Sequence, residues 1–247
     1  MPVYRPRNVE HATTSGRVYV MLDDGHYFPA YWSHPDTAGD FPGICLIHDW
    51  WGITATERRL GNLFAQMGYY VVVPDLFDGK TASSAYQAIA LVKALGDKAI
   101  GYIDKTLVSL ENHSRCNGNV AAVGLGMGGS LAFKASLMRP DLEAAVAYYG
   151  LPHSYIGRFA RAKAPILAFY GSHEPHVPAD MIERMKRELA NSPLMHDVVI
   201  LDGAARGFFD GPPVLDPNQP GTIAWETTLN FLDKHLFGKP KKAETTA

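Results

Sequence analysis

The sequence predicts an α/β protein with a mostly parallel central sheet, helices on both faces and an N-terminal antiparallel hairpin. Two patterns indicate this class. Short apolar runs, typical of strands buried on both faces, alternate with longer segments in which apolar residues recur at helical spacing. This alternation makes neighbouring strands parallel, because each helix returns the chain across the sheet. No linker or repeat interrupts it, so we expect one domain at residues 17–237, an N-terminal extension at 1–16 and a flexible tail at 238–247.

The first predicted element is the hairpin, at residues 17–35. Its two strands flank Asp23, Asp24 and Gly25, which form a turn signal. A hairpin ahead of the alternating pattern has no helix to return it, so we expect it to add antiparallel strands at one edge of the sheet.

The remaining elements alternate between strands and helices, except that the strands at 142–150 and 165–174 follow each other without a helix between them. Buried strands are predicted at residues 42–49, 70–77, 119–126, 142–150, 165–174 and 197–203. Helices are predicted at residues 56–69, 83–96, 128–138, 181–191 and 223–236. In the first helix, for example, Leu60, Leu63, Phe64 and Met67 fall on one face.

Composition excludes several classes of protein. The chain has 247 residues, 47% of them hydrophobic, which is enough to bury a large core. A formal charge of −2 provides no electrostatic footprint for nucleic acid or an anionic membrane. The start of the chain lacks the apolar segment of a signal peptide, and no run is long enough to span a membrane, so we expect a cytoplasmic protein. Two cysteines cannot form a disulfide framework, and Cys45, within an apolar run, is expected to be buried and unreactive.

The segment 124–129, GLGMGG, lies between a predicted strand and a predicted helix and fits two motifs. As G-x-G-x-x-G it could bind a dinucleotide, whose ribose needs an acid about 20 residues later, at the end of the next strand. That strand ends in Tyr148, Tyr149 and Gly150 and offers no acid. As G-x-nucleophile-x-G the segment is the sharp elbow of a hydrolase, with Gly126 at the nucleophile position. We favour the elbow, and we expect no cofactor.

Four segments in order resemble the dienelactone hydrolase family, and the resemblance covers residues 17–237. Family members read V-G-x-C-x-G-G at the elbow, P-D-L-[YF] after the second buried strand, G-x-x-D-x-x-V-P at the triad acid and G-A-x-H-x-F at the triad histidine. The corresponding segments here are Val123–Gly129, Pro74–Phe77, Gly171–Pro178 and Gly203–Phe208. The resemblance implies an α/β-hydrolase fold.

The same resemblance implies that the covalent triad is lost. Gly126 stands at the nucleophile position, Glu174 at the acid position and Arg206 at the histidine position. Glycine has no atom with which to attack, and a guanidinium stays protonated and cannot act as a general base. We expect Arg206 and Glu174 to form a bidentate ion pair. This pair is either purely structural or presents its remaining N–H groups to an anionic ligand.

Other residues were weighed as nucleophiles or as donors. Ser130, one turn along the helix, is expected to point along it rather than into the site, and Cys45 lies in mid-strand. On the family pattern, the backbone N–H groups of Trp50 and Met127 still form an oxyanion hole. We also expect Gly126 to leave extra volume, so that a ligand could sit deeper beside it.

Asp49, after the first buried strand, has two interpretations. It is either a general base next to Trp50 and Trp51, or a loop acid that accepts hydrogen bonds from backbone N–H groups, and the second is preferred. His48, His173 and His176 lie on the same rim, but H-E-P-H is not the helical zinc motif, and no metal is expected.

The pocket around the elbow is expected to be apolar. The family's substrate-carboxylate arginines are absent; Lys80 could replace one, whereas Asp210, at the other position, would repel a carboxylate. The residues expected to bind ligand are Trp50, Trp51, Lys80, Met127, Tyr149 and Phe208.

Three hypotheses about function remain. The favoured one is a non-hydrolytic member of the family that binds a small apolar or aromatic molecule with an anionic or carbonyl group. The second is an enzyme without a covalent step that uses Asp49 or a histidine as base. The third is an ester or lactone hydrolase with a rearranged triad. No nucleic-acid or membrane partner is expected, and the protein is expected to be a monomer or a homodimer.

Overall fold

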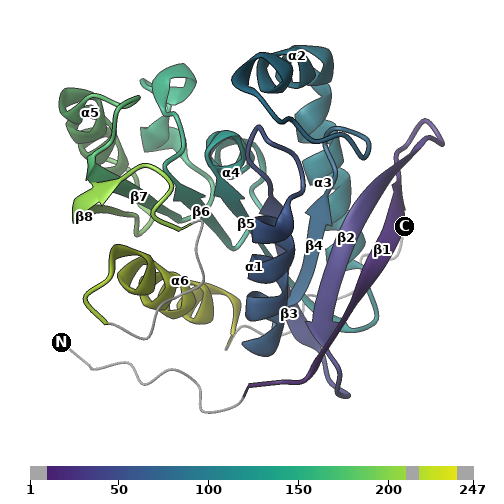
Figure 1. Cartoon of the computed structure of the whole chain (residues 1–247). Coiled ribbons are helices and arrows are strands. Elements are labelled where there is room, and N and C mark those ends of the chain that lie inside the picture. The colour runs from purple at the N-terminus through teal and green to yellow at the C-terminus, as the bar shows by residue number, and fades with distance from the viewer. Residues whose placement is uncertain (1–9, 210–216, 238–247) are drawn as a thin grey trace.

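The computed structural model describes residues 10–209 and 217–237 and contains one eight-stranded sheet (Figure 1). Its order is β1-β2-β4-β3-β5-β6-β7-β8, in which β1–β2 and β2–β4 pair antiparallel and all other neighbours pair parallel. The strands are β1 (Thr13–Met21), β2 (Tyr27–Pro35), β3 (Phe41–Ile47), β4 (Tyr70–Pro74), β5 (Cys116–Leu125), β6 (Ala144–Tyr148), β7 (Ile166–His173) and β8 (Asp197–Ala205). The predicted fold class and the edge hairpin are confirmed.

Six α-helices cover this sheet within the described residues. They are α1 (Ala55–Gln66), α2 (Ala85–Leu95), α3 (Lys98–Glu111), α4 (Met127–Met138), α5 (Ala179–Ala190) and α6 (Pro220–Leu236). α1 and α6 pack on one face, whereas α3, α4 and α5 pack on the other (Figure 1). No helix in the described part of the chain is long and apolar enough to cross a membrane.

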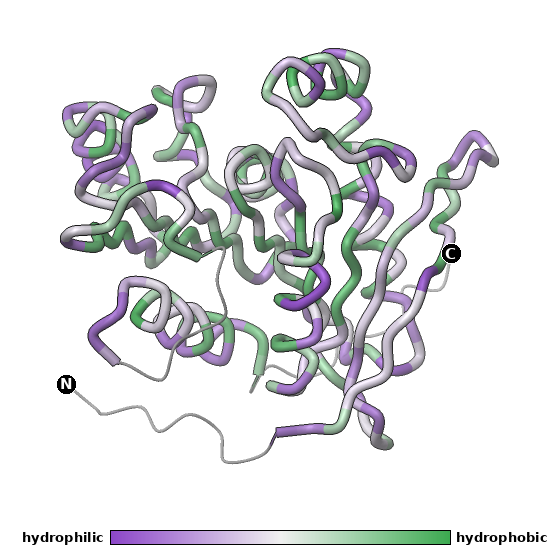
Figure 2. Tube along the Cα trace, in the orientation of Figure 1, coloured by the Kyte–Doolittle hydropathy of each residue, from purple (hydrophilic) through white to green (hydrophobic). Residues whose placement is uncertain are grey.

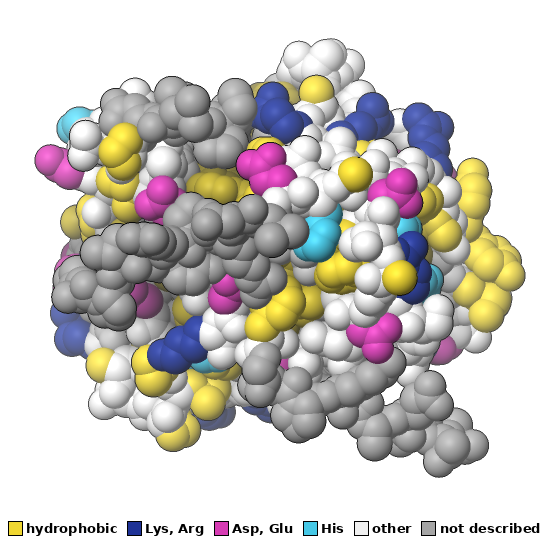
Figure 3. All heavy atoms as spheres, turned by 90° about the horizontal axis from the view of Figure 1, so that it is seen from below, with side chains coloured by type: hydrophobic (Ala, Val, Ile, Leu, Met, Phe, Trp, Pro, Cys, Tyr) yellow, Lys and Arg dark blue, Asp and Glu magenta, His cyan; other side chains and the backbone are white. Residues whose placement is uncertain are grey.

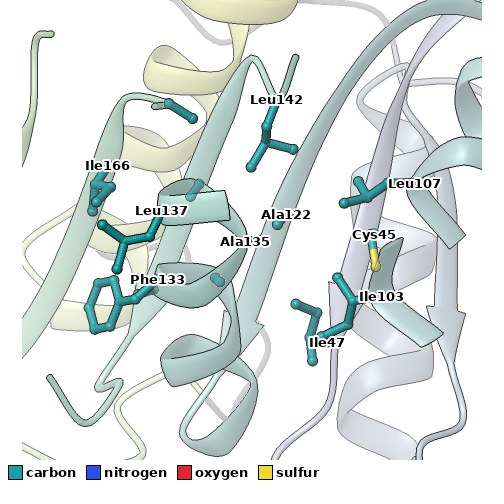
Figure 4. Packing of buried hydrophobic residues seen from close by; sticks show 14 of the residues in the cluster. Cys45, Ile47, Ile103, Leu107, Ala122, Phe133, Ala135, Leu137, Leu142 and Ile166 are labelled. Atoms are coloured by element: carbon teal, nitrogen blue, oxygen red, sulfur yellow. The ribbon is translucent and has the colours of Figure 1, made fainter. Parts of the chain in front are cut away.

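Two hydrophobic cores lie on the two faces of the sheet because successive strand side chains point in opposite directions. In β3, Cys45 and Ile47 pack under α3 and α4, whereas Ile44 and Leu46 pack under α1 and α6. Figure 4 shows the first core, where Ile103 of α3 lies beside the β3 side chains. Figure 2 shows that apolar residues are concentrated in the central strands, whereas the surrounding helices are of mixed character. The apolar runs in the sequence are therefore strands buried on both faces.

Two boundaries differ from expectation. β1 begins at Thr13, so residues 13–16, predicted to precede the domain, belong to the sheet. α3 was not predicted, because the sequence pattern was assigned as one helix followed by a strand, although Ala99, Ile103 and Leu107 have helical spacing. Only Gly96 and Asp97 separate it from α2, and Gly96 ends α2 with a φ of 52°. The predicted tail at 238–247 lies outside the described residues.

On the face shown in Figure 3, basic and acidic side chains are interspersed, and neither kind forms a large patch among the coloured residues. Exposed apolar side chains of β1 and β2 include Val18, Tyr19, Met21 and Tyr27. This surface agrees with the nearly neutral composition.

Candidate functional site

The site is built around the turn between β5 and α4. Gly126 caps α4 with φ 52° and ψ −108°, a conformation that residues with a side chain rarely adopt. Its N–H donates to the carbonyl of Tyr148 on β6 at 3.0 Å. Gly128 lets the helix approach β3 closely, since an added Cβ would lie 2.1 Å from the carbonyl oxygen of Ile47. The chain therefore forms the sharp strand-to-helix elbow that the sequence predicts.

The carboxylate of Asp49 occupies the space above this elbow. Its Oδ1 accepts hydrogen bonds from the N–H of Trp50 at 2.7 Å and from the N–H of Met127 at 2.8 Å. A Cβ built on Gly126 would lie 2.2 Å from Asp49 Oδ1 and 2.4 Å from Cγ. The Met127 N–H belongs to the first turn of α4, where a negative charge is stabilised by the helix terminus. Asp49 is thus a loop acid that accepts from backbone N–H groups, the preferred of its two interpretations.

Two expectations about the elbow need correction. The extra volume expected beside Gly126 is not open, because the Asp49 carboxylate fills it. The backbone donors of Trp50 and Met127 are in place, but both already donate to Asp49. A side chain at position 126 and the present position of the Asp49 carboxylate exclude each other.

Glu174 and Arg206 meet, as expected, but not in a bidentate pair. Arg206 Nη1 lies 3.2 Å from Glu174 Oε1, which also accepts the N–H of His176 at 3.0 Å. The Glu174 side chain is 2% exposed, and its Oε2 has no hydrogen-bond partner among the described residues. The guanidinium instead packs over the ring of Tyr149, with Cζ 5.0 Å from the ring centroid. Tyr149 itself has a φ of 43°, so the backbone at this position is strained.

A cavity of about 630 Å³ lies next to the elbow, and we call it the elbow cavity. It receives residues from the loop after β3, from α2, from α4 and from the loops after β6, β7 and β8. Its lining residues are Asp49, Trp50, Trp51, Val92, Met127, Ser130, Tyr149, Leu151, Pro175, His176, Arg206 and Gly207. Most of this lining is apolar, and Asp49 and Arg206 are its charged groups. Such a cavity suits a drug-sized ligand with an apolar body.

Some predicted ligand residues do not line this cavity. Lys80 lines a different cavity, beyond α2. Phe208 is not a lining residue but packs edge-on against Tyr149, with ring centroids 5.3 Å apart. Asp210 lies outside the described residues.

The two alternative nucleophiles are engaged or inaccessible. Ser130 lines the elbow cavity, contrary to expectation, but its Oγ donates to the Gly126 carbonyl at 3.2 Å and accepts the Leu151 N–H at 2.8 Å. The hydroxyl therefore uses its proton and a lone pair in hydrogen bonds to the backbone. Cys45 is fully buried, and burial raises the pKa of its thiol far above the usual range.

His48 is a structural residue beneath the site. Its Nε2 accepts the N–H of Leu76 at 3.1 Å, so the proton lies on Nδ1, which donates to the carbonyl of Asp49 at 2.6 Å. Both nitrogens are occupied, and neither can bind a metal. Among the described residues, no group of three or more His, Cys, Asp or Glu side chains is placed to hold a metal ion.

Burial lowers the pKa of His48, and we expect the stability of the protein to depend on pH accordingly. The unfolded chain takes up a proton near pH 6.5, whereas the folded chain resists it, so stability present above about pH 6.5 is lost as the pH falls toward the folded pKa. Urea unfolding at pH 7.5, 6.5 and 5.5 measures this loss. His48→Asn should give a shallower pH dependence and exposed His153→Asn should not; equal slopes in all three proteins would contradict this role.

Besides Ser130, four lining residues were not predicted, namely Val92, Leu151, Pro175 and Gly207. Leu151, Pro175 and Gly207 each lie close after a strand of the parallel sheet, and that position was an available signal. Val92 lies in mid-helix on α2, and only the packing of α2 over the sheet edge brings it to the cavity.

The model of the Dienelactone hydrolase family matches residues 28–236 of the chain. A carboxymethylenebutenolidase of Rhodococcus opacus is 26% identical, with 78% of this chain and 81% of the relative covered. A carboxymethylenebutenolidase of Pseudomonas putida is 27% identical, with 70% and 77% covered.

Solved structures share the fold at lower identity. A "dienelactone hydrolase-like promiscuous" phosphotriesterase from metagenomic libraries superposes with a TM-score of 0.78 at 18% identity, covering 91% of this chain and 99% of the other. A cold-adapted esterase from an Arctic intertidal metagenomic library superposes with a TM-score of 0.71 at 12% identity, covering 93% and 98%.

Proposed function

The chain belongs to the dienelactone hydrolase family. Within this family, we propose that it is a non-hydrolytic member that binds a small molecule in the elbow cavity. The observation that carries this proposal is the carboxylate of Asp49 on the N–H groups of Trp50 and Met127. In acyl transfer such donors stabilise the oxyanion of the tetrahedral intermediate. Here a side-chain oxygen of the protein itself accepts both hydrogen bonds.

The other triad positions support the same proposal. Gly126 supplies no nucleophile, and Arg206, at the position of the family histidine, is held by Glu174 and by the ring of Tyr149. A guanidinium cannot accept the proton that an attacking hydroxyl or thiol must lose. The covalent route therefore lacks both its nucleophile and its base.

The lining of the elbow cavity favours an aromatic or alicyclic ligand with a carbonyl or anionic group. The rings of Trp50 and Trp51 pack edge-on, 5.2 Å apart, and provide apolar contact area on one side. Asp49 repels an anion at the elbow, whereas Arg206 attracts one. The polar group of the ligand therefore lies at the Arg206 end, with its apolar body along the tryptophans.

The proposal is tested by hydrolysis and binding measured on the same protein. We expect p-nitrophenyl acetate to be hydrolysed at the uncatalysed rate and a fluorophosphonate probe to leave the protein unlabelled. In a thermal-shift screen of aromatic carboxylates, we expect hits that Arg206→Gln removes and that Arg187→Gln, on the exposed side of α5, retains. Stoichiometric labelling at the elbow with turnover would overturn the proposal.

A second candidate function is non-covalent acid–base catalysis by Asp49. The observation that favours it is that Asp49 lines the elbow cavity, so its carboxylate is within reach of a bound substrate. A screen of lactones and enols with the wild-type protein and Asp49→Asn separates the two candidates. Turnover that is lost in Asp49→Asn supports catalysis, and absence of turnover with every substrate supports binding alone.

A further inference from the structure

A second cavity, of about 730 Å³, lies between the β1–β2 hairpin, the loop after β4, α2 and α3, and we call it the hairpin cavity. It shares no lining residue with the elbow cavity. Helix α2 separates the two, since Val92 lines the elbow cavity whereas Leu91 and Leu95 line the hairpin cavity. In Figure 1, α2 crosses the end of the sheet above the hairpin and α3.

The inner wall of the hairpin cavity is apolar and ordered by packing. Phe28 of β2 stacks on Tyr102 of α3, with centroids 4.5 Å apart and planes 9° from parallel. Phe28, Leu76 and Phe77 are at most 5% exposed in the folded chain. A ligand that enters this cavity meets aromatic and aliphatic side chains fixed by the core beneath them.

The rim carries two ammonium groups that have no ion-pair partner among the described residues. Lys80 and Lys98 line the cavity, are exposed and take part in no ion pair within the described part of the chain. Two carboxylates also lie on the rim. Asp24 is paired with His26 at 3.1 Å, and Asp78 remains exposed. The cavity therefore combines an apolar wall with a rim of two lysines, Lys80 and Lys98, and two carboxylates, Asp24 and Asp78, of which Asp24 is held by His26.

The inner wall of this cavity is also connected to the elbow. Leu76 donates its N–H to His48, which donates in turn to the carbonyl of Asp49. The ring of Phe77 packs edge-on against His48, with centroids 4.9 Å apart. A molecule seated against Leu76 and Phe77 thus acts on a wall that is hydrogen-bonded, through one buried histidine, to the residue that occupies the elbow.

We propose that the hairpin cavity is a second binding site for a monocarboxylate with an apolar body, such as a medium-chain fatty acid, and that its occupancy is transmitted to the elbow through His48. The apolar body lies against Phe28 and Tyr102, and the carboxylate lies between Lys80 and Lys98. This proposal is independent of the proposed function of the elbow cavity, because it requires neither hydrolysis nor a ligand there.

Binding of decanoate, below its micelle concentration, tests the site by calorimetry on the full chain. We expect the double variant Lys80→Gln/Lys98→Gln to weaken binding by about tenfold or more, in line with the loss of charge-assisted contacts. Lys93→Gln, an exposed α2 residue outside both linings, is the matched control and should bind as the wild type does. Ala94→Trp places a large ring in the cavity and should abolish binding, and decanol should bind more weakly than decanoate.

The same titration followed by NMR of the tryptophan indole N–H groups tests the connection. We expect the signals of Trp50 or Trp51, next to Asp49, to shift with decanoate in the wild type and not in Ala94→Trp. Decanoate binding that is lost in Arg206→Gln but kept in Lys80→Gln/Lys98→Gln would place the ligand in the elbow cavity and overturn the proposal. Decanoate binding without a shift of either indole signal would overturn the connection through His48.

Discussion

Gly126→Ala should lower the free energy of unfolding by about 3–5 kcal/mol. Part of this loss is backbone strain, since residues other than glycine held in sparsely populated φ/ψ regions cost about 1–3 kcal/mol. The rest comes from Asp49, because the new Cβ would lie 2.2 Å from its Oδ1 and must displace the carboxylate. The N–H groups of Trp50 and Met127 would then exchange the Asp49 carboxylate for water, at a cost of about 2 kcal/mol for the two together. Urea unfolding measures the total.

A double-mutant cycle separates the two causes. Asp49→Gly removes the three atoms nearest to the new Cβ, so Gly126→Ala should cost less in that background, by about 2 kcal/mol. The remaining cost is the backbone strain alone. If the effects of the two substitutions are additive, the Asp49 carboxylate does not occupy the space at position 126, and the main support for a non-hydrolytic site is lost.

Gly128→Ala should destabilise the protein more than Gly126→Ala does, lowering the free energy of unfolding by more than about 4 kcal/mol. Point substitutions cause losses of this size only when they severely disrupt packing. Its Cβ would lie 2.1 Å from the carbonyl oxygen of Ile47 and 2.8 Å from that of His48. Both atoms belong to backbone, so no rotamer change relieves the contact, and α4 must move away from β3. Because the total stability of a domain is about 5–15 kcal/mol, this substitution should remove a large share of it, and urea unfolding measures the loss.

Gly101→Ala in α3 is the matched control. An added Cβ there meets nothing within 4 Å, and alanine favours a helix over glycine by about 1 kcal/mol. We therefore expect this variant to be as stable as the wild type or more so, by circular dichroism and urea unfolding. Gly128→Ala with near wild-type stability would show that α4 and β3 are not packed as closely as described.

Some features of the candidate site could be predicted from the sequence, and others could not. That Gly126, Glu174 and Arg206 lie at one edge of the sheet follows from the order of strand ends, because parallel strands bring their carboxyl ends to one edge. The pairing of Arg206 with Glu174 was also predictable from charge. The single N–O contact of this pair could not be predicted. The guanidinium also packs over the ring of Tyr149, which follows β6 and has a strained backbone.

The cavity that Lys80 lines could not be predicted from the sequence either. Its place after the P-D-L-F segment suggested a ligand group at the elbow, but it lines the hairpin cavity instead. The position of α2 decides this, because the helix divides the space above the sheet edge. A helix position relative to the sheet depends on packing by residues from several elements, which no local pattern encodes.

By itself, the sequence determined the fold class, the sharp elbow and the residues at its turn, with glycine at position 126. These features are local, since strand and helix periodicity, glycine at the turn and the identity of each residue are read within a few positions. Only the tertiary structure decided what occupies the elbow. Asp49 and Met127 are 78 positions apart in sequence and meet because β3 and β5 pair side by side. This pairing places the Asp49 carboxylate on the N–H groups of Trp50 and Met127. The carboxylate therefore fills the space at the elbow that a side chain at position 126 would need.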